Sequence, residues 1–180
     1  MLISGNLRLN RYNYPVEFTL REFRRQDFEV LWRIDQGCFD PEIAYSRREL
    51  AAYIGRRGAF TIVAEHSGPS DTEFGRIAGF IVAESYRGVG HIISIDVLSE
   101  HRRSGLGSLL LETAEERLRM VPCQAVRLEA AVNNAAAIAF YKRHKYSIVG
   151  TIPHYYPGGL NAFVFSKDLA QARKGAAKTG

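Results

Sequence analysis

The stretch from Gly90 to Val132 places the strongest limits on the fold. It has the pattern of a strand ending at Val97, a turn with two glycines, a helix, and a second strand over 125–132. One apolar stripe marks the helix, and Pro122 follows its end. The stripe consists of Leu106, Leu110, Ala114 and Leu118. A strand–helix–strand unit of this kind predicts a right-handed crossover between two parallel strands of one sheet.

The other segments add antiparallel elements around that unit. Strands over 60–65, 76–84 and 90–97 follow one another and predict an antiparallel meander. Further strands are predicted over 16–21, 146–152 and 162–166, and helices over 25–38, 46–56 and 134–144. The order predicts an α+β (mixed α/β) fold. Its central sheet is mostly antiparallel, with one parallel pair formed by 90–97 and 125–132 and with helices on both faces.

The chain length suits one domain with a single core. We expect an N-terminal extension over 1–15, one domain over 16–169, and a disordered basic tail over 170–180. The tail contains no large apolar side chain that could be buried.

The net charge of +5 and a pI of about 9.4 are values that often accompany nucleic-acid binding. Their distribution argues against that partner. Residues 1–15 and 170–180 hold five of the 24 basic residues and no acids, so 16–169 has 19 residues of each sign. We therefore expect no specific nucleic-acid partner, although a basic protein bound to RNA or to the ribosome stays an alternative.

Several classes of protein are disfavoured by what the chain contains. Apolar runs are far shorter than the ~20 residues of a membrane helix, and residues 1–6 do not have the pattern of a secretory signal. Cys38 and Cys123 offer neither a disulfide framework nor zinc spacing. We expect a cytoplasmic protein with no membrane association and no metal.

The turn after Val97 carries the clearest chemical signal. It is basic through Arg102 and Arg103, and Gly105 and Gly107 stand at the start of the helix. Open backbone amides at a helix N-terminus attract anions, and glycines let an anion approach closely. A tight turn without function is the alternative. Neither the P-loop nor the dinucleotide-binding fingerprint fits the spacing, because Gly107 is followed by Ser108-Leu109 and a third glycine is missing at position 110.

The remaining pattern, Arg-x-x-Gly-x-Gly between a strand and a helix, resembles the acyl-CoA pyrophosphate loop of the GNAT N-acetyltransferase superfamily. The predicted order of strands and helices is also that family's order. The resemblance implies a GNAT fold and acetyl-CoA as the cosubstrate.

A second segment, Leu-Glu-x-x-x-x-Asn-x-x-Ala-Ile-x-x-Tyr from Leu128 to Tyr141, is similar to the protein N-terminal acetyltransferases, including the bacterial ribosomal-protein alanine N-acetyltransferase. The residues alone leave alternatives open. Glu129 in an apolar strand is either paired in a salt bridge, for example with Arg127, or it accepts a proton in a cleft. Asn134 caps a helix. By spacing alone, Tyr141 is a core residue.

The resemblance implies roles for these positions. Glu129 is the general base and Tyr141 the general acid that protonates the leaving thiolate. Backbone groups of one strand bind the pantetheine arm, the turn and helix start surround the pyrophosphate, and Asn134 contacts the cofactor. The cofactor-binding residues implied are Ile95, Asp96, Val97, Arg102, Arg103, Ser104, Gly105, Leu106, Gly107, Ser108, Asn134 and Tyr141.

Two segments are expected to bind the acceptor. Tyr155 and Tyr156 lie in a segment that resembles the peptide entry of the N-terminal acetyltransferases, and Phe39 and Tyr45 lie between the first two predicted helices. The chain departs from the family where Lys145-Tyr146 replaces the usual Gly-Phe, so the helix before it has to end without a glycine.

The function predicted is transfer of an acetyl group from acetyl-CoA to a primary amine by direct attack in a ternary complex. The leading acceptor is a protein or peptide N-terminus, possibly that of a ribosomal protein, and the enzyme is expected to be a monomer or a homodimer. Two alternatives are a small-molecule amine acetyltransferase and a non-catalytic acyl-CoA-binding module.

Overall fold

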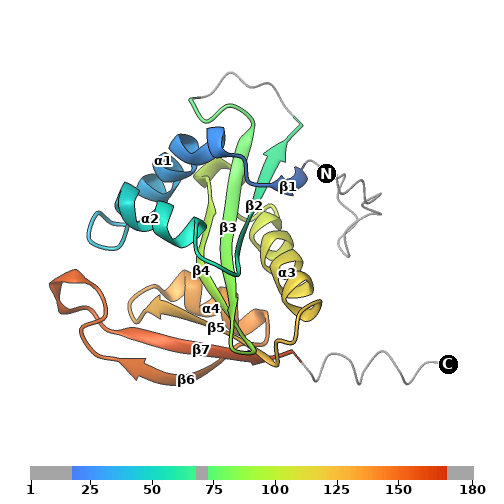
Figure 1. Cartoon of the computed structure of the whole chain (residues 1–180). Coiled ribbons are helices and arrows are strands. Elements are labelled where there is room, and N and C mark those ends of the chain that lie inside the picture. The colour runs from blue at the N-terminus through green and yellow to red at the C-terminus, as the bar shows by residue number, and fades with distance from the viewer. Residues whose placement is uncertain (1–17, 68–72, 170–180) are drawn as a thin grey trace.

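Residues 18–67 and 73–169 are described by the computed structural model, and their strands form one seven-stranded sheet (Figure 1). The sheet order is β1-β2-β3-β4-β5-β7-β6; among these residues β4 and β5 pair in parallel and every other neighbouring pair is antiparallel. The predicted α+β fold with one parallel pair is confirmed. The strands are β1 (Phe18–Glu22), β2 (Ala59–His66), β3 (Ile77–Tyr86), β4 (Val89–Val97), β5 (Ala125–Ala131), β6 (Ser147–Ile152) and β7 (Ala162–Asp168).

Helices cover both faces of the sheet. On one face, α1 (Phe28–Cys38) and α2 (Arg47–Ile54) enclose a core cluster that includes Leu31, Leu50 and Phe80. On the other face, α3 (Leu106–Arg119) and α4 (Ala135–Arg143) contribute to a second cluster. The whole apolar stripe of α3 is buried in it, which confirms the helical pattern in the sequence.

Strand β4 separates from β5 after a short stretch of pairing. The two strands pair over Val89–His91 and Ala125–Arg127. Just beyond the paired stretch, the β3–β4 register shifts by one residue, and Ile93 is the extra residue in β4. A bulge of this kind bends and twists its strand. In Figure 1, β6 and β7 run across the direction of β3 and β4. The sheet therefore opens between the C-terminal halves of β4 and β5.

The chain leaves α4 without glycine. His144 ends the helix, and the next residue, Lys145, has a φ of 69°. Glycine is the usual residue in this left-handed conformation, because other side chains are strained there. The residue after the C-cap of α4 thus has the left-handed backbone conformation that commonly ends helices, with lysine in place of the usual glycine.

The predicted N-terminal extension over 1–15 and the predicted basic tail over 170–180 lie outside the described residues. Within 18–67 and 73–169, no helix is long and apolar enough to cross a membrane.

Candidate active site

A groove of about 1270 Å³ opens where β4 and β5 separate. Its walls come from β4, β5, the segment between α1 and α2, the start of α3, α4, and residues 155–157. This volume exceeds the ~300–1,000 Å³ typical of pockets for single small ligands. The groove therefore has room for two reactants in one cavity.

One end of the groove is formed by the N-terminus of α3. Gly105, the N-cap, has a φ of 91° and no side chain, so it provides no capping oxygen. By contrast, α2 and α4 are capped by the side chains of Ser46 and Asn134. The amides of Gly107 and Ser108 precede the first intrahelical bond, which runs from the Leu109 amide to the Gly105 carbonyl, and both residues line the groove. Helix-terminal amides with this exposure bind anions.

Arginines reinforce the positive potential at this end. Arg102 and Arg103 both line the groove. The Nε of Arg102 donates to the Val97 carbonyl at 3.0 Å, which holds its guanidinium at the end of β4. The Cys38 thiol approaches the same carbonyl at 3.5 Å. Because burial and the nearby charge of Asp96 raise the pKa of Cys38 to about 11, this residue is a neutral thiol at physiological pH.

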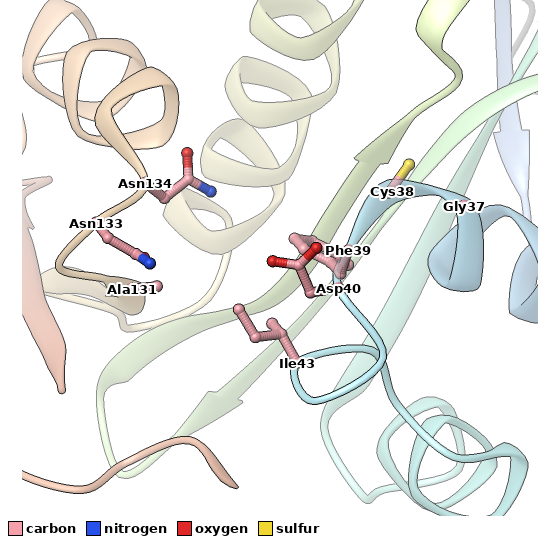
Figure 2. Close-up of a pocket in the computed structure, with 8 residues that line it drawn as sticks. All are labelled: Gly37, Cys38, Phe39, Asp40, Ile43, Ala131, Asn133 and Asn134. Atoms are coloured by element: carbon pink, nitrogen blue, oxygen red, sulfur yellow. The ribbon is translucent and has the colours of Figure 1, made fainter. Parts of the chain in front are cut away.

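A smaller pocket of about 320 Å³ adjoins the groove and shares lining residues with it (Figure 2). Figure 2 shows Asn133 and Asn134 on one side and Phe39, Asp40 and Ile43 on the other. The Asn134 Oδ1 accepts the Ala137 amide at 3.0 Å, so the predicted helix cap is present. The helix cap uses Oδ1, so the Nδ2 group is the part of this side chain that is able to donate to a ligand.

Glu129 is paired with a histidine inside the groove. Its Oε2 lies 2.7 Å from the Nε2 of His91, and both residues line the cavity. The Nδ1 of His91 lies 3.7 Å from the Oε1 of Glu84. Burial by itself lowers the pKa of His91, but the hydrogen bond and charge of Glu129, together with the charge of Glu84, outweigh burial and raise it. The strand carboxylate is therefore paired, and its partner is His91, not Arg127.

Tyr141 is both a core residue and part of the groove wall. Its side chain is only 7% exposed and packs against Phe140, Tyr146 and Phe165. Burial and the charge of Asp96 raise the pKa of Tyr141, so its hydroxyl keeps its proton across the physiological range. A protonated hydroxyl at a groove wall is able to act as a proton donor.

The other end of the groove is lined with aromatic side chains. Tyr45 is fixed on three sides: its amide donates to Asp35, its carbonyl accepts from Gln36 and Trp32, and its hydroxyl donates to the carbonyl of Ile93 at the β4 bulge. Across the groove, Tyr155 and Tyr156 pack edge to face at 4.9 Å. Burial and the charge of Glu129 raise the pKa of both tyrosines, so they are neutral hydrogen-bonding groups.

The structure brings most of the residues singled out in the sequence to this one groove. Asp96, Ser104 and Leu106 do not line it. Leu106 is buried in the core, and the Ser104 hydroxyl donates to the His101 carbonyl. Asp96 points into the interior, where its Oδ2 accepts from Ser94 at 2.5 Å. Because the side chains of Asp96 and Leu106 are buried, any contact these two make with a ligand has to use their backbone. The groove-lining residues singled out are Phe39, Tyr45, Ile95, Val97, Arg102, Arg103, Gly105, Gly107, Ser108, Glu129, Asn134, Tyr141, Tyr155 and Tyr156.

His91 is the site residue that sequence reasoning missed. It lies in the strand predicted to run parallel to 125–132, opposite Arg127 in the observed register. The parallel pairing was predictable, but its register was not, so the closeness of His91 to Glu129 could not be seen in the sequence. In the described part of the chain, no group of three or more His, Cys, Asp or Glu side chains is placed to hold a metal ion.

Comparison with known proteins gives this groove a context. The model of the acetyltransferase (GNAT) family matches residues 20–146. An uncharacterized N-acetyltransferase of Methanocaldococcus jannaschii is 36% identical over 155 residues, covering 86% of this chain and 94% of the relative. An N-alpha-acetyltransferase of Sulfurisphaera tokodaii is 36% identical over 81 residues, covering 44% of this chain. The match to this second relative spans about half of its length, 48%.

Solved structures share the architecture. Ard1 from Thermoplasma volcanium superposes with a TM-score of 0.74 at 28% identity, covering 85% of this chain and 98% of that one. Arabidopsis thaliana NAA60 in complex with acetyl-CoA also gives a TM-score of 0.74, at 19% identity, covering 85% and 99%. At that lower identity the likeness concerns the fold alone.

Proposed function

The chain belongs to the acetyltransferase (GNAT) family, and we propose that its acceptor is the α-amine at the N-terminus of a protein or peptide. Family membership confirms the predicted GNAT fold, the N-acetyltransferase activity and acetyl-CoA as the cosubstrate. The choice of acceptor is supported by similarity to proteins named N-alpha-acetyltransferase.

The cofactor end of the groove has the chemistry that acetyl-CoA requires. The amides of Gly107 and Ser108 at the start of α3, with Arg102 and Arg103 beside them, suit the pyrophosphate. The opening between β4 and β5 exposes strand backbone for the amides of the pantetheine arm, and Asn134 adds a side-chain donor. Acetyl-CoA, when bound, supplies an acyl thioester; the groups that act on the acceptor amine belong to the chain.

The observation that carries the proposal is the Glu129–His91 pair in the wall of the groove. An amine attacks a thioester only when it is neutral. An α-amine has a pKa of about 7.7–8.0 and a lysine side chain about 10.4, so a mild base serves the first and not the second. Glu129 accepts the proton of the amine at its carboxylate, directly or through a water molecule, when His91 is neutral.

Tyr141 supplies the complementary proton. Its buried hydroxyl stays protonated and donates to the departing thiolate. Covalent transfer through Cys38 is disfavoured, because its buried thiol has a raised pKa and a thiol is a poor nucleophile compared with a thiolate. The residues therefore favour direct attack in a ternary complex.

The aromatic end is proposed to hold the first residues of the acceptor. Tyr45 on one wall and Tyr155 and Tyr156 on the other present rings for packing and hydroxyls for the peptide backbone. A ribosomal protein as acceptor, a cytoplasmic location, and a monomeric or homodimeric state stay predictions.

A panel of acceptors tests the proposal. We expect acetylation of peptides with a free N-terminus, with saturation at low concentration, and slow or no acetylation of polyamines and aminoglycoside-like amines. Turnover of the small amines alone would overturn the peptide proposal.

A further inference from the structure

We propose that Asp35 is a positioning residue for the acceptor: through Tyr45, it fixes the segment between α1 and α2 as one wall of the groove. We call this segment, residues 39–46, the acceptor wall. Asp35 does not itself line the groove, so it acts on the acceptor through the position of Tyr45. The inference rests on the proposed function, because it assumes that the acceptor peptide lies at the aromatic end.

The acceptor wall has little structure of its own. In this fully described segment, residues 39–46 form neither helix nor strand, yet 41–46 all line the groove. Two backbone hydrogen bonds lie within the segment, and both run to the Asp40 carbonyl, from the amides of Ile43 and Ala44. The position of its last residues therefore depends on contacts with other elements.

One face of α1 holds Tyr45 in place. Trp32, Asp35 and Gln36 are three and four residues apart, so they lie on the same side of the helix. The Oδ2 of Asp35 accepts the Tyr45 amide at 2.8 Å. The Tyr45 carbonyl accepts from the side chains of Trp32 at 3.1 Å and Gln36 at 2.8 Å. Gln36 also donates to the same Asp35 oxygen at 3.1 Å, so the carboxylate holds Tyr45 directly and orients a second residue that holds it.

The other end of Tyr45 is attached to the sheet. Its hydroxyl donates to the carbonyl of Ile93, the extra residue of the β4 bulge, at 3.2 Å. Its ring packs against that of Tyr53, with 5.0 Å between the ring centroids. The bond from Asp35 therefore decides whether the backbone of Tyr45, and with it the acceptor wall, keeps one position while the ring is held elsewhere.

The burial of Asp35 is unfavourable for the fold. Its side chain is fully buried, and its Oδ1 has no hydrogen-bond partner among the described residues. Two further carboxyl groups, those of Glu49 on α2 and Asp96 on β4, lie near enough to interact with it electrostatically. An apolar residue of similar size avoids the cost of burying a carboxyl group. A buried carboxyl with an unsatisfied oxygen calls for an explanation, and the anchored amide of Tyr45 provides one.

Initial rates of the purified chain with two acceptors test the inference. One acceptor is a hexapeptide with a free N-terminus, and the other is alaninamide, which has the α-amine but no second residue. Asp35→Ala and Asp35→Leu both remove the group that accepts the Tyr45 amide, and leucine refills the space. We expect the KM of the hexapeptide to rise about tenfold or more in both variants, because apparent affinity falls with the fraction of molecules whose acceptor wall is in place.

Other quantities should stay nearly constant in these two variants. The kcat for the hexapeptide should remain within about twofold, because the bound peptide restores the acceptor wall. The kcat/KM for alaninamide and the calorimetric affinity for CoA should also remain within about twofold. The CoA titration shows in addition whether each variant is folded. If one of the two variants does not fold, the other decides the result.

Two control variants make the result specific. Asp35→Asn keeps an oxygen that accepts the Tyr45 amide, so its KM for the hexapeptide should lie within about threefold of the wild type. Ile34→Val creates a small cavity in the core beneath the same helix and should leave this KM unchanged.

Three results would each overturn the inference alone. They are an unchanged hexapeptide KM in the folded Asp35 variants, an equal fall in kcat/KM for both acceptors, and an Asp35→Asn variant as impaired as Asp35→Ala. Acetylation of neither acceptor by the wild-type chain would instead overturn the proposed function, and the inference with it.

Discussion

Replacing Glu129 with glutamine separates the chemistry of the carboxylate from its shape. Glutamine fills the same space and is still able to hydrogen-bond to His91, but it has no negative charge and accepts no proton from the amine. If Glu129 is the general base, kcat should fall roughly 10²–10⁴-fold, the usual contribution of such a group. The substitution should leave the affinity for CoA unchanged, because Glu129 lies on β5 and is not one of the groups that form the anion cradle at the start of α3.

The same substitution should also change the pKa of His91 and its contribution to stability. The partly buried His91–Glu129 bond of 2.7 Å involves a charged group, and such a bond contributes about 1.5–3 kcal/mol. Because the hydrogen bond and charge of Glu129 are the main causes that raise the pKa of His91, this pKa should fall in Glu129→Gln. In the folded wild-type protein the pKa of His91 lies above 6.5, its value in the unfolded chain. This difference stabilises the fold fully at a pH below 6.5, and the stabilisation is lost as the pH rises through the folded-state pKa. The variant should lack it.

Initial rates with a saturating peptide and acetyl-CoA measure the fall in kcat, and an NMR titration of the His91 ring measures the fall in its pKa. Glu84→Gln is the matched control, because Glu84 also faces His91 but does not line the groove. It should lower the pKa of His91 slightly and leave kcat nearly intact. A Glu129→Gln variant with wild-type kcat and a lowered His91 pKa would refute the base and leave a purely structural ion pair.

Three further substitutions probe other parts of the account. Tyr141→Phe should lower kcat at least tenfold with little change in Tm or CoA affinity, because only a proton donor is lost; unchanged kcat would show that Tyr141 is only a core residue. Gly105→Val should abolish detectable CoA binding in a calorimetric titration, because a β-branched residue is strained at a φ of 91° and crowds the cradle; wild-type affinity would show that the α3 terminus does not bind the cofactor. Burial raises the pKa of Asp35 from 3.8 to about 6, so the free energy of unfolding should fall by about 3 kcal/mol as the pH rises from below 3.8 to above 6. In urea unfolding, Asp35→Asn should lose this pH dependence of stability, and a variant that keeps it would show that another group causes it.

Much of the fold was predictable because its signals are local. The stripe on α3 specified a helix packed on a sheet, and the strand on each side specified a crossover with one handedness. The α4 cap at Asn134 was readable in the same way, since a capping side chain acts on its own helix. The end of α4 was harder to predict from the sequence, because Lys145 adopts a positive φ that residues with a side chain do not favour.

The parts that sequence reasoning missed depend on register between distant strands. The bulge at Ile93 could not be predicted, because no glycine or proline marks it in the sequence. The carbonyl of this extra residue accepts the hydrogen bond from the Tyr45 hydroxyl. The pairing of His91 with Glu129 depends on the offset of β4 against β5, which no local pattern specifies. Alternation along β4 explains why Asp96 is buried while Ile95 and Val97 line the groove.

The choice of the α-amine as acceptor is tested most directly by one competition experiment. A peptide with a free N-terminus and an internal lysine is incubated with the enzyme and acetyl-CoA, and fragmentation by mass spectrometry locates the acetyl group. The account predicts one acetyl group on the N-terminal α-amine, and none in the Glu129→Gln variant over the same time. Acetylation confined to the lysine, or of a peptide with a blocked N-terminus at the same rate, would contradict it.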